Sequence, residues 1–349
     1  MGAEKMKAGY FPPGDRWQDG VWLLAALILS GAGLWTVERG ISWDHFRLFL
    51  THFHFCFLLG ALLVAALLFI AEAIRVQVIL HLVGESLPLG RALQVALSTA
   101  FALGITPFGV GGPPVQTYLL KRSGIPLEKS LTVAATQAAW TVGFFVPVLP
   151  LAVRVGYGKT AGREELFLIL FGLTWLAFLT ACCYLLVTRP HLVYILTFKL
   201  TGILPPGLVP RRRFLARRVM GELLRLSRTV KLVFNSGAAA ILKVTLWTAV
   251  IWGALFVMGP LLLLGLGVHT SWLVLIARQI VIYFIISTVP LPGGSGLAEL
   301  GAATVFRPLL PGSLLPGFIA AWRFFTYYLQ LLVGGPILWY SLRSGQIVP

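Results

Sequence analysis

The sequence predicts an all-α polytopic membrane protein made of two inverted-topology repeats. Three observations predict it: an apolar composition, apolar stretches long enough to cross a bilayer, and two Pro/Gly-rich breaks at similar places in the two halves. Of 349 residues, 58% are hydrophobic and 11% are charged, whereas soluble domains have about 25% charged residues. We therefore expect residues 1–349 to form a single membrane domain, in which each span needs about 20 apolar residues.

The distribution of basic residues predicts how the chain is oriented in the membrane. The net charge is +16, and ten of the 28 basic residues lie between Arg189 and Lys231, where Glu222 is the one acid. Basic loops stay on the cytoplasmic side. Residues 189–236 are therefore predicted to be a cytoplasmic insert.

Within this insert, residues 211–231 place apolar side chains at near-helical spacing between arginines. This pattern is typical of an amphipathic helix on the anionic inner leaflet. The alternative is a solvated loop whose charges only fix the topology. Nucleic acid is not an expected partner, because no aromatic and basic surface lies outside the predicted spans.

The first repeat, residues 20–155, starts from a cytoplasmic N-terminus. Its predicted segments are Val21–Val37, Phe55 to past Ala73, the broken segment Ala92–Leu120, and Leu131–Val153. The broken segment has basic residues on both flanks. We therefore expect it to be a re-entrant hairpin that enters and leaves on the cytoplasmic face.

The second repeat, residues 165–341, has the same order with the opposite orientation. Its predicted segments are Glu165–Val187, Ala238–Gly267, the broken segment Trp272–Phe306, and Leu315–Tyr340. The total is about eight membrane segments, with three spanning helices and one re-entrant hairpin in each repeat. Both termini are then cytoplasmic.

The two breaks read "ITPFGVGGPPVQTYLLK" and "STVPLPGGSGLAEL", and the double glycines Gly111–Gly112 and Gly293–Gly294 are taken as corresponding. Irregular backbone at membrane depth is tolerated where protein covers it or where it lines a wet cavity. Facing broken helices mark the substrate site of many inverted-repeat carriers. The breaks therefore predict a polar binding site near the midplane. The alternative is that the glycines only permit tight helix packing and the prolines only kink the spans.

The second arm of each break is expected to begin a helix, with Pro114 in the first turn of one and Ser295 or Gly296 capping the other. Free backbone N–H groups and the helix dipole would then favour an anion, such as a phosphate.

Charged residues inside the predicted membrane segments also suggest a substrate path, because charges in lipid are costly. Glu299 and Arg323 reach similar depth and are expected to pair, either at the substrate site or as a structural salt bridge. Arg75, close to Glu72, and Arg278 line the path or simply snorkel toward the surface.

Neither a metal nor a cofactor is expected. Cys56, Cys182 and Cys183 lie in apolar runs without metal-ligand spacing, and the six histidines are scattered at membrane edges. The sequence also lacks a nucleophile–base set and a paired acidic motif, so we expect no enzymatic activity.

The two break motifs, together with Arg323 in "WRFFTYYLQLLVGG", resemble the flippase-like membrane region of lysylphosphatidylglycerol synthetases. The resemblance covers nearly the whole chain. Full-length synthetases add a cytoplasmic domain that transfers lysine from aminoacyl-tRNA to phosphatidylglycerol, and we expect none here. The family often has a charged residue in the third span, where this chain has Thr136 and Gln137, which leaves the headgroup open.

The resemblance and the residue patterns together give the candidate headgroup-binding set. Its members are Arg75, Thr106, Pro107, Gly111, Gly112, Pro114, Gln116, Arg278, Pro292, Gly293, Gly294, Gly296, Glu299 and Arg323.

The expected function is that of a lipid flippase or scramblase-like carrier in the cell (inner) membrane. Its substrates would be lipids with anionic phosphate headgroups: aminoacyl-phosphatidylglycerol, a phospholipid or a polyprenyl-phosphate-linked lipid. The alternatives are a membrane-embedded lipid-modifying or glycosyl transferase, or an accessory partner of a lipid synthetase. A homodimer is left open.

Overall fold

The computed structural model describes residues 43–158, 163–189 and 235–343, with residues 191, 195, 224, 227 and 231–233. Within these residues the regular structure is helical, without strands. The predicted span Val21–Val37 and nearly all of the predicted amphipathic segment 211–231 lie outside the described residues.

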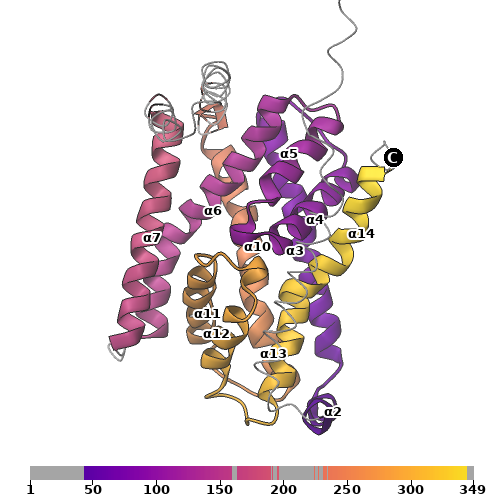
Figure 1. Ribbon diagram of the computed structural model, residues 1–349, viewed down its shortest axis with the longest axis vertical. Helices are drawn as coiled ribbons and strands as arrows, with labels where there is room; N and C mark the ends of the chain where they lie inside the picture. The colour runs from indigo at the N-terminus through magenta and orange to yellow at the C-terminus, as the bar shows by residue number, and fades with distance from the viewer. Residues whose placement is uncertain are drawn as a thin grey trace, which may run out of the picture.

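Three helices in the described part are long and apolar enough to cross a membrane: α3 (Cys56–Leu82), α6 (Leu127–Gly156) and α10 (Ala238–Gly265). Each matches a predicted span to within a few residues at its start, and α3 runs to Leu82. Helices α3 and α10 pack against each other along the centre of the molecule (Figure 1). Exposed leucines on both, such as Leu63 and Leu242, suit contact with lipid.

Two further helices flank this centre. Helix α7 (Arg163–Thr188) packs against α6, and its bounds are close to those of the predicted segment Glu165–Val187. The short helix α2 (Trp43–His52) precedes α3 and packs on α13. The sequence reading did not predict α2.

The first broken segment forms a helical hairpin. Helix α4 (Leu89–Ile105) ends at the short 3₁₀ turn η1 (Pro107–Gly109), and α5 (Gly112–Arg122) follows. A salt bridge of 2.6 Å joins Glu85, before α4, to Lys129, after α5. Both open ends of the hairpin therefore lie at the same end of the molecule.

The second broken segment has the same order of elements. Helix α11 (Trp272–Ile286) leads to the 3₁₀ turn η4 (Pro292–Gly294), and α12 (Leu297–Phe306) packs back on α11. The predicted helix from the "PGGSG" motif to Phe306 is confirmed, with Gly296 as its N-cap.

The final predicted span is not one regular helix. Helix α13 (Leu315–Arg323) passes through a π-helical turn, η5 (Phe324–Tyr328), into α14 (Leu329–Arg343). Such turns insert an extra residue and often occur at functional sites.

The two hairpins point toward each other. Figure 1 shows α4 and α5 in the upper half of the view and α11 and α12 in the lower half, and the turns η1 and η4 contact each other. Each first arm also packs on a helix from the other part of the chain, α4 on α14 and α11 on α6. The two breaks therefore contact each other.

Candidate functional site

The turns η1 and η4 have nearly the same backbone conformation. In each, the residue after proline is left-handed: Phe108 has φ 54° and ψ 10°, and Gly293 has φ 58° and ψ 14°. The third residue is left-handed too, at φ 66° for Gly109 and 63° for Gly294. A non-glycine residue in this region is uncommon, and such outliers cluster at functional sites.

This match corrects the glycine pairing expected from the sequence. Gly294 corresponds to Gly109, whereas Gly111 has φ −75° and Gly112 lies in the first turn of α5. At Gly112 the need for glycine is steric, because a Cβ atom would lie 2.4 Å from Cγ of Leu103.

Each hairpin also supplies its own acceptor for the N-cap of its second arm. Oγ1 of Thr106 accepts a 2.9 Å hydrogen bond from the N–H of Gly111, and Oε2 of Glu299 accepts one of 2.7 Å from the N–H of Gly296. One backbone N–H group at the start of each second arm is therefore already paired. In α5, Pro113 and Pro114 remove two further donors, because proline has no N–H.

A buried ion pair contacts the second break. Nε of Arg323 donates to Oε1 of Glu299 at 2.8 Å, and the two residues are 4% and 0% exposed. Nη2 of Arg323 donates to the carbonyl oxygen of Gly293 at 3.2 Å, and its guanidinium carbon lies 4.3 Å from the ring centre of Tyr327. The predicted Glu299–Arg323 contact is confirmed.

A second Glu–Arg pair lies on α3. Nη2 of Arg75 donates to both carboxylate oxygens of Glu72, at 2.9 and 2.8 Å. Nη1 contacts Oγ1 of Thr248 on α10 at 3.4 Å. Nε of Arg75 is buried without a hydrogen-bond partner among the described residues, so this guanidinium is only partly satisfied.

Two glutamines connect this pair to the first hairpin. Gln116, on α5, donates to Oε1 of Gln137 at 2.6 Å, and Gln137, on α6, donates to Glu72 at 3.4 Å. Gln116 is 3% exposed. A polar chain therefore runs from the second arm of the first hairpin through α6 to α3 and Arg75.

Arg278 does not join either cluster. Its Nε donates to the carbonyl oxygen of Gly156 at 3.0 Å, and its guanidinium lies 5.9 Å from the ring centre of Tyr157. A cation is favourable at the C-terminus of a helix, here α6. Arg278 therefore interacts with the C-terminal end of α6.

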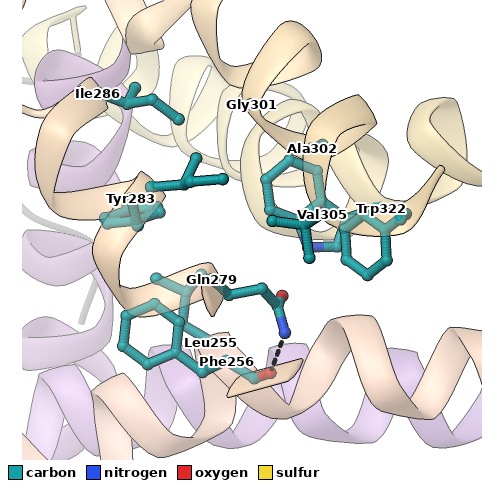
Figure 2. Close-up of a pocket in the computed structure, with 11 residues that line it drawn as sticks. Leu255, Phe256, Gln279, Tyr283, Ile286, Gly301, Ala302, Val305 and Trp322 are labelled. Carbon is teal, nitrogen blue, oxygen red and sulfur yellow. Dashed lines mark hydrogen bonds between the residues drawn. The ribbon is translucent and has the colours of Figure 1, made fainter. Parts of the chain in front are cut away.

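A small cavity of about 10 Å³ lies between α10, α11, α12 and α13. Figure 2 shows Gln279 reaching across it, with Nε2 donating to the carbonyl oxygen of Phe256 at 3.2 Å. Most of the lining is apolar, and such a volume holds about one water molecule. This cavity is too small for a lipid headgroup, and no residue of η1 or η4 lines it.

Sequence reasoning missed Tyr327 and Thr248, and noted Gln137 only as a departure from the family pattern. Tyr327 follows Arg323 by four residues and so shares its helix face, which is a signal the sequence did contain. Among the described residues, no group of three His, Cys, Asp or Glu side chains is placed to hold a metal ion.

Comparison with known proteins gives matches to membrane proteins. Residues 22–334 match the family described as the lysylphosphatidylglycerol synthase TM region. A curated relative is the UPF0104 membrane protein of Archaeoglobus fulgidus, 24% identical over 300 residues, which cover 83% of this chain and 88% of the relative. The apolar helices and this match make the chain an integral membrane protein, and it belongs to the lysylphosphatidylglycerol synthase TM region family.

Proposed function

We propose that this protein carries a lipid with an anionic phosphate headgroup from one membrane leaflet to the other. The headgroup crosses through a polar path at the breaks while the acyl chains stay in the bilayer. The observation that carries the proposal is the contact between η1 and η4, the tips of two hairpins that point toward each other.

On this proposal the two halves of the chain form an inverted repeat, and the order and packing of the helices support it. Helices α3 and α10 precede the two hairpins, and α6 and the α13–α14 segment follow them. The exchange of packing partners, α4 on α14 and α11 on α6, is the relation expected of two halves with opposite orientation. On this proposal both hairpins are re-entrant, which gives about eight membrane segments.

Arg75 is the better of the two arginines for binding phosphate. Arg323 already binds Glu299, the Gly293 carbonyl and an aromatic ring. Arg75 keeps a buried Nε without a partner among the described residues. A planar guanidinium can donate hydrogen bonds to a phosphate through its remaining N–H groups. Glu72, whose side chain is 27% exposed, serves as the counter-ion of Arg75 until the headgroup arrives.

In the proposed orientation both termini and the basic residues 189–236 lie on the cytoplasmic side of the cell membrane. The segment 211–231 would bind the anionic inner leaflet. On this proposal the headgroup path runs from the Glu72–Arg75 pair to the Glu299–Arg323 pair and links the two membrane faces.

Leaflet exchange in proteoliposomes tests the proposal. Vesicles contain a fluorescent phospholipid in both leaflets, and an impermeant quencher reaches only the outer leaflet. We expect purified protein to raise the quenched fraction above the value for empty vesicles, and Arg75→Gln to lower the rate at least fivefold. A matched control is Arg343→Gln, because Arg343 lies at the end of α14 against Trp339.

Two outcomes would reject the proposal. One is a quenched fraction equal to that of empty vesicles with folded protein. The other is a new lipid product by chromatography without leaflet exchange, which would favour a lipid-modifying transferase.

A further inference from the structure

Tyr327 lies between the two hairpins. It belongs to the π-turn η5 and is 2% exposed. Its hydroxyl donates a 3.1 Å hydrogen bond to the carbonyl oxygen of Gly104. That carbonyl lies in the last turn of α4, where helix carbonyls have no intrahelical donor. Tyr327 therefore binds the first hairpin directly before its break.

The ring of the same residue lies against the second break. A Cβ atom at Gly293 would come within 2.1 Å of Cε2 of Tyr327, so ring and backbone are in close contact. The guanidinium carbon of Arg323 also contacts this ring and lies 4.3 Å from its centre. Tyr327 thus contacts Gly293 in the second break, the guanidinium of Arg323 and the last turn of α4.

The π-turn explains how one helix reaches all three groups. A π-helical turn closes i→i+5 hydrogen bonds and so contains an extra residue. Arg323, at its start, consequently lies near both Tyr327 and Tyr328, whose ring centre is 5.9 Å from the guanidinium. A regular helix would not present both rings to the same cation.

We propose that Tyr327 is a positioning residue that couples the two hairpins, so that a displacement at one break is transmitted to the other. This inference rests on the proposed lipid-carrying function, because alternating access requires the two breaks to move together. The hydroxyl holds the first hairpin, and the ring holds Gly293 and Arg323. Loss of the hydroxyl alone should therefore uncouple the hairpins, while the ring keeps its contacts with Gly293 and Arg323.

The test variant is Tyr327→Phe, which keeps the ring and removes only the hydrogen bond to Gly104. The matched control is Tyr340→Phe, on α14 and 54% exposed. Spin labels are attached at Val110 in the first break and Leu300 on α12, which are 63% and 55% exposed. The three native cysteines are replaced by serine in every sample.

We expect Tyr327→Phe to keep a Tm close to that of the parent. The distance distribution between the two labels should broaden, and leaflet exchange should slow at least threefold. Tyr340→Phe should match the parent in all three measurements. The distance measurement needs no transport, so it decides the coupling even where the parent carries no lipid and the proposed function fails.

An unchanged distance distribution in Tyr327→Phe would overturn the inference, whatever the exchange rate. A lowered Tm with slower exchange and an unchanged distribution would also overturn it, because Tyr327 would then have only a structural role.

Discussion

Arg323 donates from Nε to Oε1 of Glu299 over 2.8 Å, and Oε2 of the same carboxylate accepts the N–H of Gly296. One buried carboxylate therefore serves as the counter-ion of an arginine and as the cap of α12. A headgroup that displaced Arg323 would leave Glu299 bound to its helix.

The first prediction separates the two roles of Glu299. Arg323→Leu leaves the carboxylate buried without its counter-ion and should cost about 3–5 kcal/mol of stability. Glu299→Gln keeps an acceptor for Gly296 but removes the charge. The double variant should therefore unfold at a higher temperature than Arg323→Leu alone. Thermal unfolding of the parent, both single variants and the double variant gives the coupling energy.

Leaflet exchange should stay low in this double variant, since the cation is absent from the path. Recovery of both stability and exchange to parent values would show that the pair is only structural. Arg278→Leu is the comparison, because Arg278 binds the α6 terminus.

A second prediction concerns two glycines that are required for different reasons. Gly293→Ala places a side chain at φ 58°, which costs roughly 1–2 kcal/mol, and also forces its Cβ against Tyr327. At Gly112→Ala the nearest atoms to the new Cβ belong to the side chain of Leu103, which is 43% exposed and can move. Adding Leu103→Ala should rescue Gly112→Ala, whereas no single replacement of a neighbour should fully rescue Gly293→Ala.

Thermal unfolding in detergent checks this order, with Leu103→Ala measured alone. Gly253→Ala is the control, since nothing lies within 4 Å of a Cβ there. It should stabilise α10 by up to about 1 kcal/mol. Equal losses for Gly293→Ala and Gly112→Ala would argue against the steric distinction.

The third prediction tests the cap of the first break. Thr106→Val removes the acceptor for the Gly111 N–H and should cost about 1 kcal/mol, while Thr106→Ser should stay within about 0.5 kcal/mol of the parent. Thr304→Val is the control, because this exposed threonine only donates to a carbonyl of its own helix. The measurement is chemical or thermal unfolding. A Thr106→Ser variant as unstable as Thr106→Val would reject the capping role.

A fourth prediction compares two glutamates. Glu72→Gln removes the counter-ion of Arg75, which is 5% exposed, and should cost more than 1 kcal/mol. Glu85→Gln breaks a pair whose side chains are 28% and 25% exposed, and such pairs contribute about 0–1 kcal/mol. Unfolding measurements on both variants decide the order. A larger loss for Glu85→Gln would mean that the polar chain around Arg75 contributes little.

The fifth prediction concerns topology. Single cysteines at Gly90 and Gly124 flank the first hairpin, and both should react with an impermeant reagent from the cytoplasmic face only. A cysteine at His269, between α10 and α11, should react from the opposite face only. Labelling of positions 90 and 124 from opposite faces would mean that this segment spans the membrane.

Much of the fold could be predicted from local sequence signals. Apolar runs predicted the starts of α3, α6 and α10 to within a few residues, because lipid requires every span to satisfy its own backbone hydrogen bonds. Proline and glycine located both breaks, since proline removes a donor and glycine allows left-handed backbone. The π-turn in the last helix carried no comparable signal and was missed.

Local sequence signals did not predict which residues of the two breaks are equivalent. Composition paired the two double glycines, whereas the backbone pairs Phe108 with Gly293. Phenylalanine is a poor predictor of left-handed backbone, because surrounding contacts must hold a side chain in that conformation.

By itself, the sequence determined that this is an apolar, all-helical membrane protein with breaks at two fixed places, because those features depend on neighbouring residues. Only the tertiary structure decided that Gln116 is connected to Arg75 through Gln137 and Glu72, and that Tyr327 contacts both hairpins. These contacts join residues as far as 223 positions apart. No local pattern specifies them, since they arise only when separate helices pack and their buried polar groups must find partners.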